Sequence, residues 1–254
     1  IPRVGIRGVF AAIRRLRRHK HAARFVVAQT LYLTAATTDG TSASIFAQEV
    51  VGLPVVRIVR LAIFAAVAGA FGSVATAVLA RAIGARPALC GLMSIPPLLL
   101  LYTSLILSTE EEFLAIGMLR AFVAGGVGFH GLNRGVFSQM VPVGHEAEFF
   151  GAYFVAIKLS SWIGPLACAL LNEMTGSLRL AILSALFFYI PSLLVMAFAT
   201  DFEAARAEAA AATPCALPKP QQAQPLWRGP SEQLLPPGPR SKDVLYGSSG
   251  VVYH

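Results

Sequence analysis

Three ionisable residues lie deep inside apolar stretches of the sequence: Asp39, Arg120 and Lys158. A charge at membrane depth is costly, so such residues usually pair with one another or mark a substrate or ion pathway. Asp39 and Arg120 fall at the same depth when each stretch is built as a helix, roughly 4–5 Å from the midplane on the non-cytosolic side. Because opposite charges reduce each other's burial cost, the sequence predicts an Asp39–Arg120 pair, with either a structural role or a place in a substrate or proton pathway.

Lys158 belongs to a second cluster of polar residues. Ser161, Trp162 and Pro165 follow it at the spacing that places side chains on one helix face. A lysine, a hydroxyl and an indole on one face could line a polar cavity. The alternative is that Lys158 only satisfies a carbonyl or an aspartate within the bundle. The candidate residues for substrate binding or a proton pathway are therefore Asp39, Arg120, Lys158, Ser161 and Trp162.

Composition indicates that these residues lie in a membrane protein. The chain has 254 residues, of which 56% are hydrophobic and 13% charged, whereas a soluble domain carries about 25% charged residues. Six apolar runs are each long enough to cross a hydrocarbon layer of roughly 30 Å; they cover residues 25–47, 59–79, 88–107, 113–133, 149–171 and 178–199. A soluble all-helical protein with buried helices is the weaker alternative. The sequence thus predicts an all-α integral membrane protein with six transmembrane helices in residues 25–200.

Lysine and arginine placement predicts the orientation. Residues 1–24 form a basic linker with eight lysines and arginines, which places this end in the cytosol. Its basic cluster could bind nucleic acid or anionic lipid, and its position beside a membrane span favours lipid. Arg57, Arg60 and Arg179 contradict the orientation rule, since they fall on the non-cytosolic side. Residues 201–254 form a cytosolic tail, helical to about 212 and then proline-rich and disordered.

Other motifs give no sign of an enzyme, a cofactor or a metal site. Residues 126–131 match a GxGxxG pattern, but they lie inside an apolar run rather than between a strand and a helix. His145 and Glu146 lack the second histidine of a zinc protease, and the three cysteines are scattered. Glycines within an apolar run are typical of closely packed membrane helices.

Residues 137–165 read FSQMVPVGHEAEFFGAYFVAIKLSSWIGP. This loop and the helix after it resemble vacuole effluxers, the autophagy-related protein 22-like branch of the major facilitator superfamily. Asp39-Gly40 in the first run, and Thr175-Gly176 with Arg179 before the last, also look like the family pattern. The resemblance covers about residues 22–200.

This resemblance implies the C-terminal six-helix half of a twelve-helix secondary transporter. Such a protein would release amino acids from the vacuole to the cytosol by alternating access, without a cofactor, in partnership with an N-terminal half and the lipid bilayer. In that architecture the first and fourth helices of each half line the central cavity, and these helices carry Asp39 and Arg120. We expect the chain to be the trailing part of a longer protein in the vacuolar membrane, with the plasma membrane as the alternative.

The leading alternative function is a membrane scaffold or pseudo-transporter half that does not transport. Three charges at membrane depth favour transport, because a scaffold has no need of them. A membrane-embedded enzyme ranks third, since neither a nucleophile nor a metal cluster can be argued.

Overall fold

The computed structural model describes residues 12–123 and 126–212, and every regular element within these ranges is helical. The all-α prediction is therefore confirmed for the part of the chain that the structure describes. The first eleven residues of the basic linker and the tail beyond residue 212 lie outside the described residues. The predicted disorder of that tail stays a prediction.

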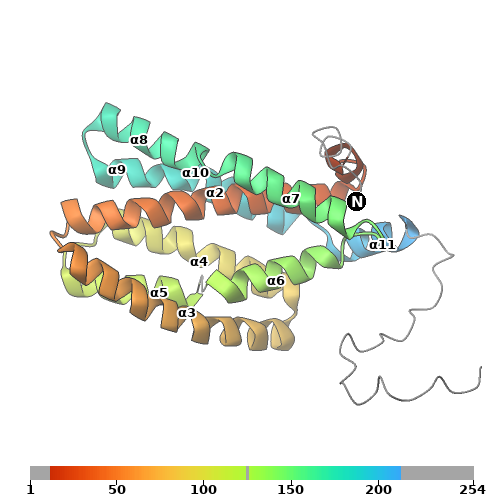
Figure 1. Ribbon diagram of the computed structural model, residues 1–254, viewed down its shortest axis with the longest axis horizontal. Helices are drawn as coiled ribbons and strands as arrows, with labels where there is room; N and C mark the ends of the chain where they lie inside the picture. Colours follow the sequence, from red (N-terminus) through yellow and green to blue (C-terminus); the bar gives the residue numbers. More distant parts are fainter. Residues whose placement is uncertain (1–11, 124–125, 213–254) are drawn as a thin grey trace, which may run out of the picture. The chain divides into compact units, whose positions relative to one another are not determined.

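A helical turn over residues 12–16 precedes the main elements. These are α2 (Lys20–Glu49), α3 (Val55–Ile83), α4 (Ala85–Leu105), α5 (Glu110–Val123), α6 (Gly126–Ser138), α7 (Glu146–Ser160) and α8 (Ile163–Thr175). The last apolar run folds as α9 (Leu178–Ile182), the 3₁₀ turn η1 (Leu183–Ala185), α10 (Leu186–Leu194) and the π-helical turn η2 (Val195–Ala199), and α11 (Phe202–Ala212) follows it (Figure 1).

Four helical segments among the described residues are long and apolar enough to cross a membrane: Val55–Ile83, Ala85–Leu105, Glu146–Thr175 and Leu178–Ala199. They overlap four of the six predicted runs. The run at 25–47 lies in α2, which is 30 residues long but carries several threonines, two glutamines and Asp39. The run at 113–133 is divided between α5 and α6 around residues 124–125, which lie outside the described residues. These two spans stay predictions.

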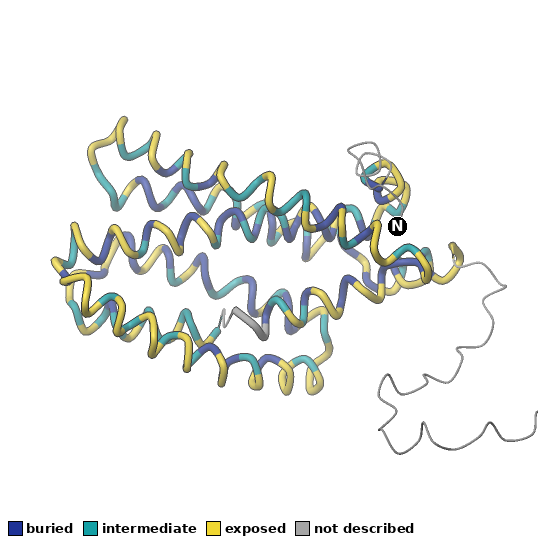
Figure 2. Tube along the Cα trace, viewed as in Figure 1, coloured by how far each residue is buried: buried dark blue, intermediate teal, exposed yellow. Residues whose placement is uncertain are grey.

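Helix α2 lies at the centre of the packing. It contacts α7, α8 and α10 on one side, while α3 packs against α5 and α6 (Figure 1). Figure 2 shows that buried positions recur along α2, whereas α3 is largely exposed. The buried residues of α3 are Gly69, Gly72 and Thr76, and its exposed side chains include Phe71, at 68%. An exposed apolar helix of this length is stable where its surroundings are lipid or another helix, so its burial pattern fits a membrane.

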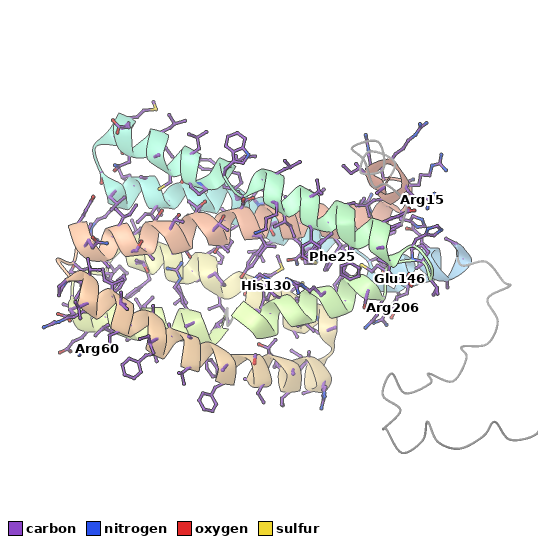
Figure 3. All side chains as sticks on the ribbon, in the orientation of Figure 1. Arg15, Phe25, Arg60, His130, Glu146 and Arg206 are labelled. Atoms are coloured by element: carbon purple, nitrogen blue, oxygen red, sulfur yellow. The ribbon has the colours of Figure 1, made fainter. Side chains whose placement is uncertain are left out.

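Charged side chains gather at the two ends of the helices. Figure 3 labels Arg60 at one end and Arg15 and Arg206 at the other. Arg15 forms an ion pair with Glu148 at 2.7 Å, which joins the basic segment to the start of α7. Charged side chains at both ends match the two water-facing borders of a membrane protein.

Arginines also satisfy backbone carbonyls where helices end. Arg179 donates to the carbonyl oxygens of Ser104 and Leu107, at 3.3 and 2.8 Å, and so binds the end of α4. Arg86 and Arg24 donate to carbonyls of η2, at 3.1 and 3.0 Å. Unsatisfied carbonyls are expensive near hydrocarbon, so these contacts stabilise the helix ends.

Asp201 caps α11 and gives a pH-dependent prediction. Its Oδ1 accepts hydrogen bonds from the backbone N–H of Ala204 and Glu203, and these bonds hold the pKa of Asp201 below its usual value. Because the pKa is lower in the folded state, this stabilisation is present above the unfolded pKa of about 3.9 and is lost as the pH falls through the folded value. Thermal unfolding in detergent is measured over a pH series. We expect Asp201→Ala to lower the unfolding temperature at pH 7. At the acidic end of the series, the variant and the wild type should unfold at the same temperature. An equal decrease at both pH values would contradict the role of the ionised cap.

Candidate functional site

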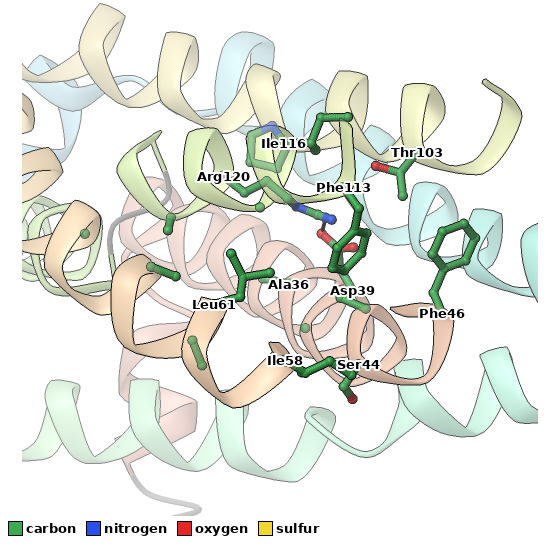
Figure 4. Close-up of a pocket in the computed structure, with 18 of the residues that line it drawn as sticks. Ala36, Asp39, Ser44, Phe46, Ile58, Leu61, Thr103, Phe113, Ile116 and Arg120 are labelled. Atoms are coloured by element: carbon green, nitrogen blue, oxygen red, sulfur yellow. Dashed lines mark ion pairs between the residues drawn. The ribbon is translucent and has the colours of Figure 1, made fainter. Parts of the chain in front are cut away.

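Asp39 of α2 and Arg120 of α5 form an ion pair inside the helical bundle (Figure 4). The pairing predicted from their common depth is therefore present. Their side chains are 8% and 17% exposed, whereas both side chains of every other ion pair in the described part of the chain exceed 20%. Two opposite charges that are both largely removed from water attract each other more strongly than a surface pair, and loss of either one leaves the other charge buried without a partner.

The ion pair lies in the wall of a cavity of about 700 Å³. Helices α2, α3 and α5 form most of the wall, with smaller contributions from α4, α9 and α10. The contribution of α3 is apolar and mostly small: Ile58, Leu61, Ala62, Ala65, Ala66, Gly69 and Ala70. The cavity thus sets one charged wall against one apolar wall, which is the usual character of a small-molecule site.

Two tyrosines that the sequence did not single out line the same cavity. Tyr32 of α2 and Tyr189 of α10 are almost fully buried, with ring centroids 5.4 Å apart in an edge-to-face contact. Tyr32 precedes Asp39 by two helical turns, so a search along that face of α2 could have found it. Nothing in the sequence places Tyr189 beside them, because that contact depends on how α10 packs against α2.

A buried amide pair cross-links α2 with α6, about one helical turn before Tyr32 on α2. Asn133 Nδ2 donates to Gln29 Oε1 at 2.8 Å, and Gln29 Nε2 contacts Met93 Sδ at 3.7 Å. Gln29 and Asn133 are both 0% exposed. A hydrogen bond of this kind, away from water, fixes the relative position of the helices that carry it.

The second predicted cluster does not line this cavity. Lys158 is exposed and makes no hydrogen bond or ion pair through its side chain within the described residues, and Trp162 is 60% exposed. The helix that carries these residues is interrupted, because α7 ends at Ser160 and α8 begins at Ile163. Ser161 and Trp162 keep backbone angles in the right-handed helical region, so the prediction that they share a face with Lys158 stays a prediction. The Ser161 hydroxyl donates to the Lys158 carbonyl at 2.9 Å within this interruption. A role for the cluster in a substrate or proton pathway stays a prediction.

Threonines of α2 donate hydrogen bonds to backbone carbonyls that are left free between α7 and α8. Thr34 and Thr37 donate to the carbonyl oxygens of Ser160 and Ser161, at 3.3 and 3.4 Å. Gly164, at the start of α8, lies so close to α2 that a Cβ there would overlap Thr38 Oγ1. The backbone just before Asp39 is therefore held firmly against α8.

Arg120 is positioned by a second close approach. A Cβ at Gly72 of α3 would overlap the carbonyl oxygen of Phe122, two residues after Arg120 on α5. Because this contact involves the backbone of α5, it sets the distance between the two helices. Both partners of the ion pair thus lie on helices that pack against a glycine.

The GxGxxG pattern and the histidine of the loop before α7 lie where helices and helix ends form. Backbone residues 126–131 are helical within α6, which is not the strand–turn–helix of a dinucleotide site. His145 and Glu148 both bind Arg15, whose Nη1 lies 2.8 Å from His145 Nδ1. Within the described ranges, no three histidine, cysteine or acidic side chains are grouped as metal ligands.

Comparison with known proteins identifies the family. The family model described as "Vacuole effluxer Atg22 like" matches residues 3–210. The chain belongs to this family. The resemblance inferred from residues 137–165 is therefore confirmed over most of the chain.

Curated proteins that are similar to this chain come from a bacterium and from fungi. The "Uncharacterized MFS-type transporter YxiO" of Bacillus subtilis is 32% identical over 95 residues, covering 37% of this chain and 22% of the relative. "Autophagy-related protein 22" of Botryotinia fuckeliana is 25% identical, covering 67% and 27%. "Autophagy-related protein 22-1" of Aspergillus niger is 25% identical, covering 76% and 33%.

The chain thus spans between 22% and 33% of the length of these three relatives. No solved structure matches it.

Proposed function

We propose that this chain forms one six-helix half of a major facilitator transporter that moves amino acids from the vacuole to the cytosol by alternating access. Membership of the vacuole effluxer family supports this proposal. The observation that carries it is the Asp39–Arg120 pair in the wall of a cavity of about 700 Å³. The N-terminal half of the same transporter supplies the other half of the translocation pathway.

The charges of the cavity suit a zwitterion. The Arg120 guanidinium offers parallel donors to a carboxylate, and the Asp39 carboxylate accepts from an ammonium group. An amino acid that enters between them replaces one ion pair with two, so no charge is left without a partner. The apolar wall of α3 then contacts the substrate's side chain, while the Tyr32 and Tyr189 hydroxyls supply further polar contacts.

The same exchange gives a physical basis for alternating access. In the absence of substrate, the Asp39–Arg120 pair ties α2 to α5. A substrate that binds both residues weakens this direct link and stabilises a different spacing of the two helices. A ligand shifts a conformational equilibrium only through such a difference in affinity between states.

A substrate series tests the proposed function. The full-length protein that carries this chain is reconstituted in liposomes, and uptake of an apolar amino acid is compared with that of its decarboxylated amine and its deaminated acid. We expect both analogues to be taken up at least about tenfold more slowly, since each leaves one buried charge unpaired. Protein-free liposomes measure leakage. Equal uptake of the amine or the acid would contradict zwitterion recognition by this pair.

A further inference from the structure

Three arginines lie on the side of the membrane that the orientation rule predicts to be poor in positive charge: Arg57, Arg60 and Arg179. Arg179 binds backbone carbonyls at the end of α4. Arg57 binds both carboxylate oxygens of Glu110, at 2.5 and 2.7 Å. These two arginines therefore have structural roles that explain their position.

Arg60 has no such role. Its side chain is exposed and makes no hydrogen bond or ion pair with the residues that the structure describes. It lies one helical turn after Arg57, near the start of α3, at the end of the bundle where α5 also begins (Figure 3). A free guanidinium at the border of the membrane is placed to bind an anion from outside the chain.

Arg60 lines a second cavity, of about 530 Å³, between α3 and α5. Arg57 and Glu110 complete its polar end, and the rest of its lining is apolar: Leu61, Phe64, Leu114 and Met118. Phe64 follows Arg60 by one turn, a distance of about 6 Å along the helix axis, and is 56% exposed. The cavity is thus polar at the membrane border and apolar toward the middle of the bilayer.

We propose that this cavity binds an anionic phospholipid of the non-cytosolic leaflet. The phosphate binds the Arg60 guanidinium, for which it is a geometrically matched bidentate partner. The first part of an acyl chain lies against Phe64, Leu114 and Met118. A soluble anion would use the arginine but would leave the apolar lining empty, so the combined polarity favours a lipid. This inference does not depend on the proposed transport activity.

A lipid-binding experiment tests the proposal. The full-length protein that carries this chain is purified in a mild detergent, and bound phosphatidylglycerol and phosphatidylcholine are counted by native mass spectrometry. We expect phosphatidylglycerol to bind more tightly, and Arg60→Gln to weaken its binding about fivefold, as loss of one arginine near a membrane surface predicts. Arg81→Gln is the matched control, because Arg81 is exposed at the opposite end of the same helix.

A second variant tests the apolar part of the cavity. Leu114→Gln is expected to weaken phosphatidylglycerol binding while Arg60 is still present, and thermal unfolding without added lipid verifies that each variant is folded. Wild-type binding by Arg60→Gln would overturn the proposal, as would equal weakening by Arg81→Gln. Full competition by inorganic phosphate would also overturn it in favour of a site for soluble anions.

Discussion

Asp39→Asn and Arg120→Gln are each expected to lower the free energy of unfolding by about 2–3 kcal/mol, because each leaves a buried charge without its partner. The loss is smaller than the roughly 3–5 kcal/mol of a fully buried pair. Both side chains line a cavity that admits water, and Arg120 keeps 17% of its side chain exposed. Thermal unfolding of the purified protein in detergent measures the effect.

The double variant Asp39→Asn with Arg120→Gln should regain most of the lost stability. Two neutral amides can hydrogen-bond to each other, so neither is left as an isolated charge. In a double-mutant cycle this recovery appears as a strong coupling energy between the two positions. If the two single losses instead add in the double variant, the residues are not coupled and the pair does not stabilise the bundle.

Amino-acid uptake by the same three variants separates stability from function. We expect uptake to fall to background in all three, since the amides can balance neither the carboxylate nor the ammonium of a substrate. The double variant is decisive because it restores the fold without the charges. If it transports at the wild-type rate, the pair is a structural link between α2 and α5 and does not bind substrate.

The fold was largely readable from the sequence because its signal is local. Apolar runs of about 20 residues report helices directly, and four of the six coincide with segments able to span a membrane. The hydrophobic signal was weakest for two of the runs. One lies in α2, where threonines interrupt the apolar pattern, and the other is divided between α5 and α6. Polar residues that face other helices lower the apparent hydrophobicity of a span, so central helices are the hardest to recognise from composition.

The site was only partly predictable. Depth along two helices was enough to pair Asp39 with Arg120, because a long helix converts residue number into position. Depth does not indicate the direction of a side chain around the helix axis, so it could not show that Lys158 is exposed and lies outside the cavity of Asp39 and Arg120. The contribution of Tyr189 depends on packing between helices far apart in sequence, which no local pattern specifies.

Gly72→Ala is the second change with a large expected effect. Its new Cβ would overlap the carbonyl oxygen of Phe122, which belongs to the backbone of α5 and cannot turn aside as a side chain can. Helices α3 and α5 must therefore move apart, at a cost of about 1–3 kcal/mol in the free energy of unfolding. Gly91→Ala is the matched control, because Gly91 is also helical and nothing lies within 4 Å of its Cβ. That control should gain up to about 1 kcal/mol, since alanine favours helix over glycine.

Transport should decrease in Gly72→Ala by more than the loss of stability explains. Arg120 lies half a turn before Phe122, so a displaced α5 carries the guanidinium away from Asp39. A shift of about 1 Å in a binding group can cost an order of magnitude or more in rate, so we expect at least about tenfold slower uptake. Uptake is measured well below the unfolding temperature of each variant, where nearly all of the protein is folded. A rate equal to that of Gly91→Ala under these conditions would mean that the α3–α5 contact supports the fold alone, and that the position of Arg120 is set elsewhere.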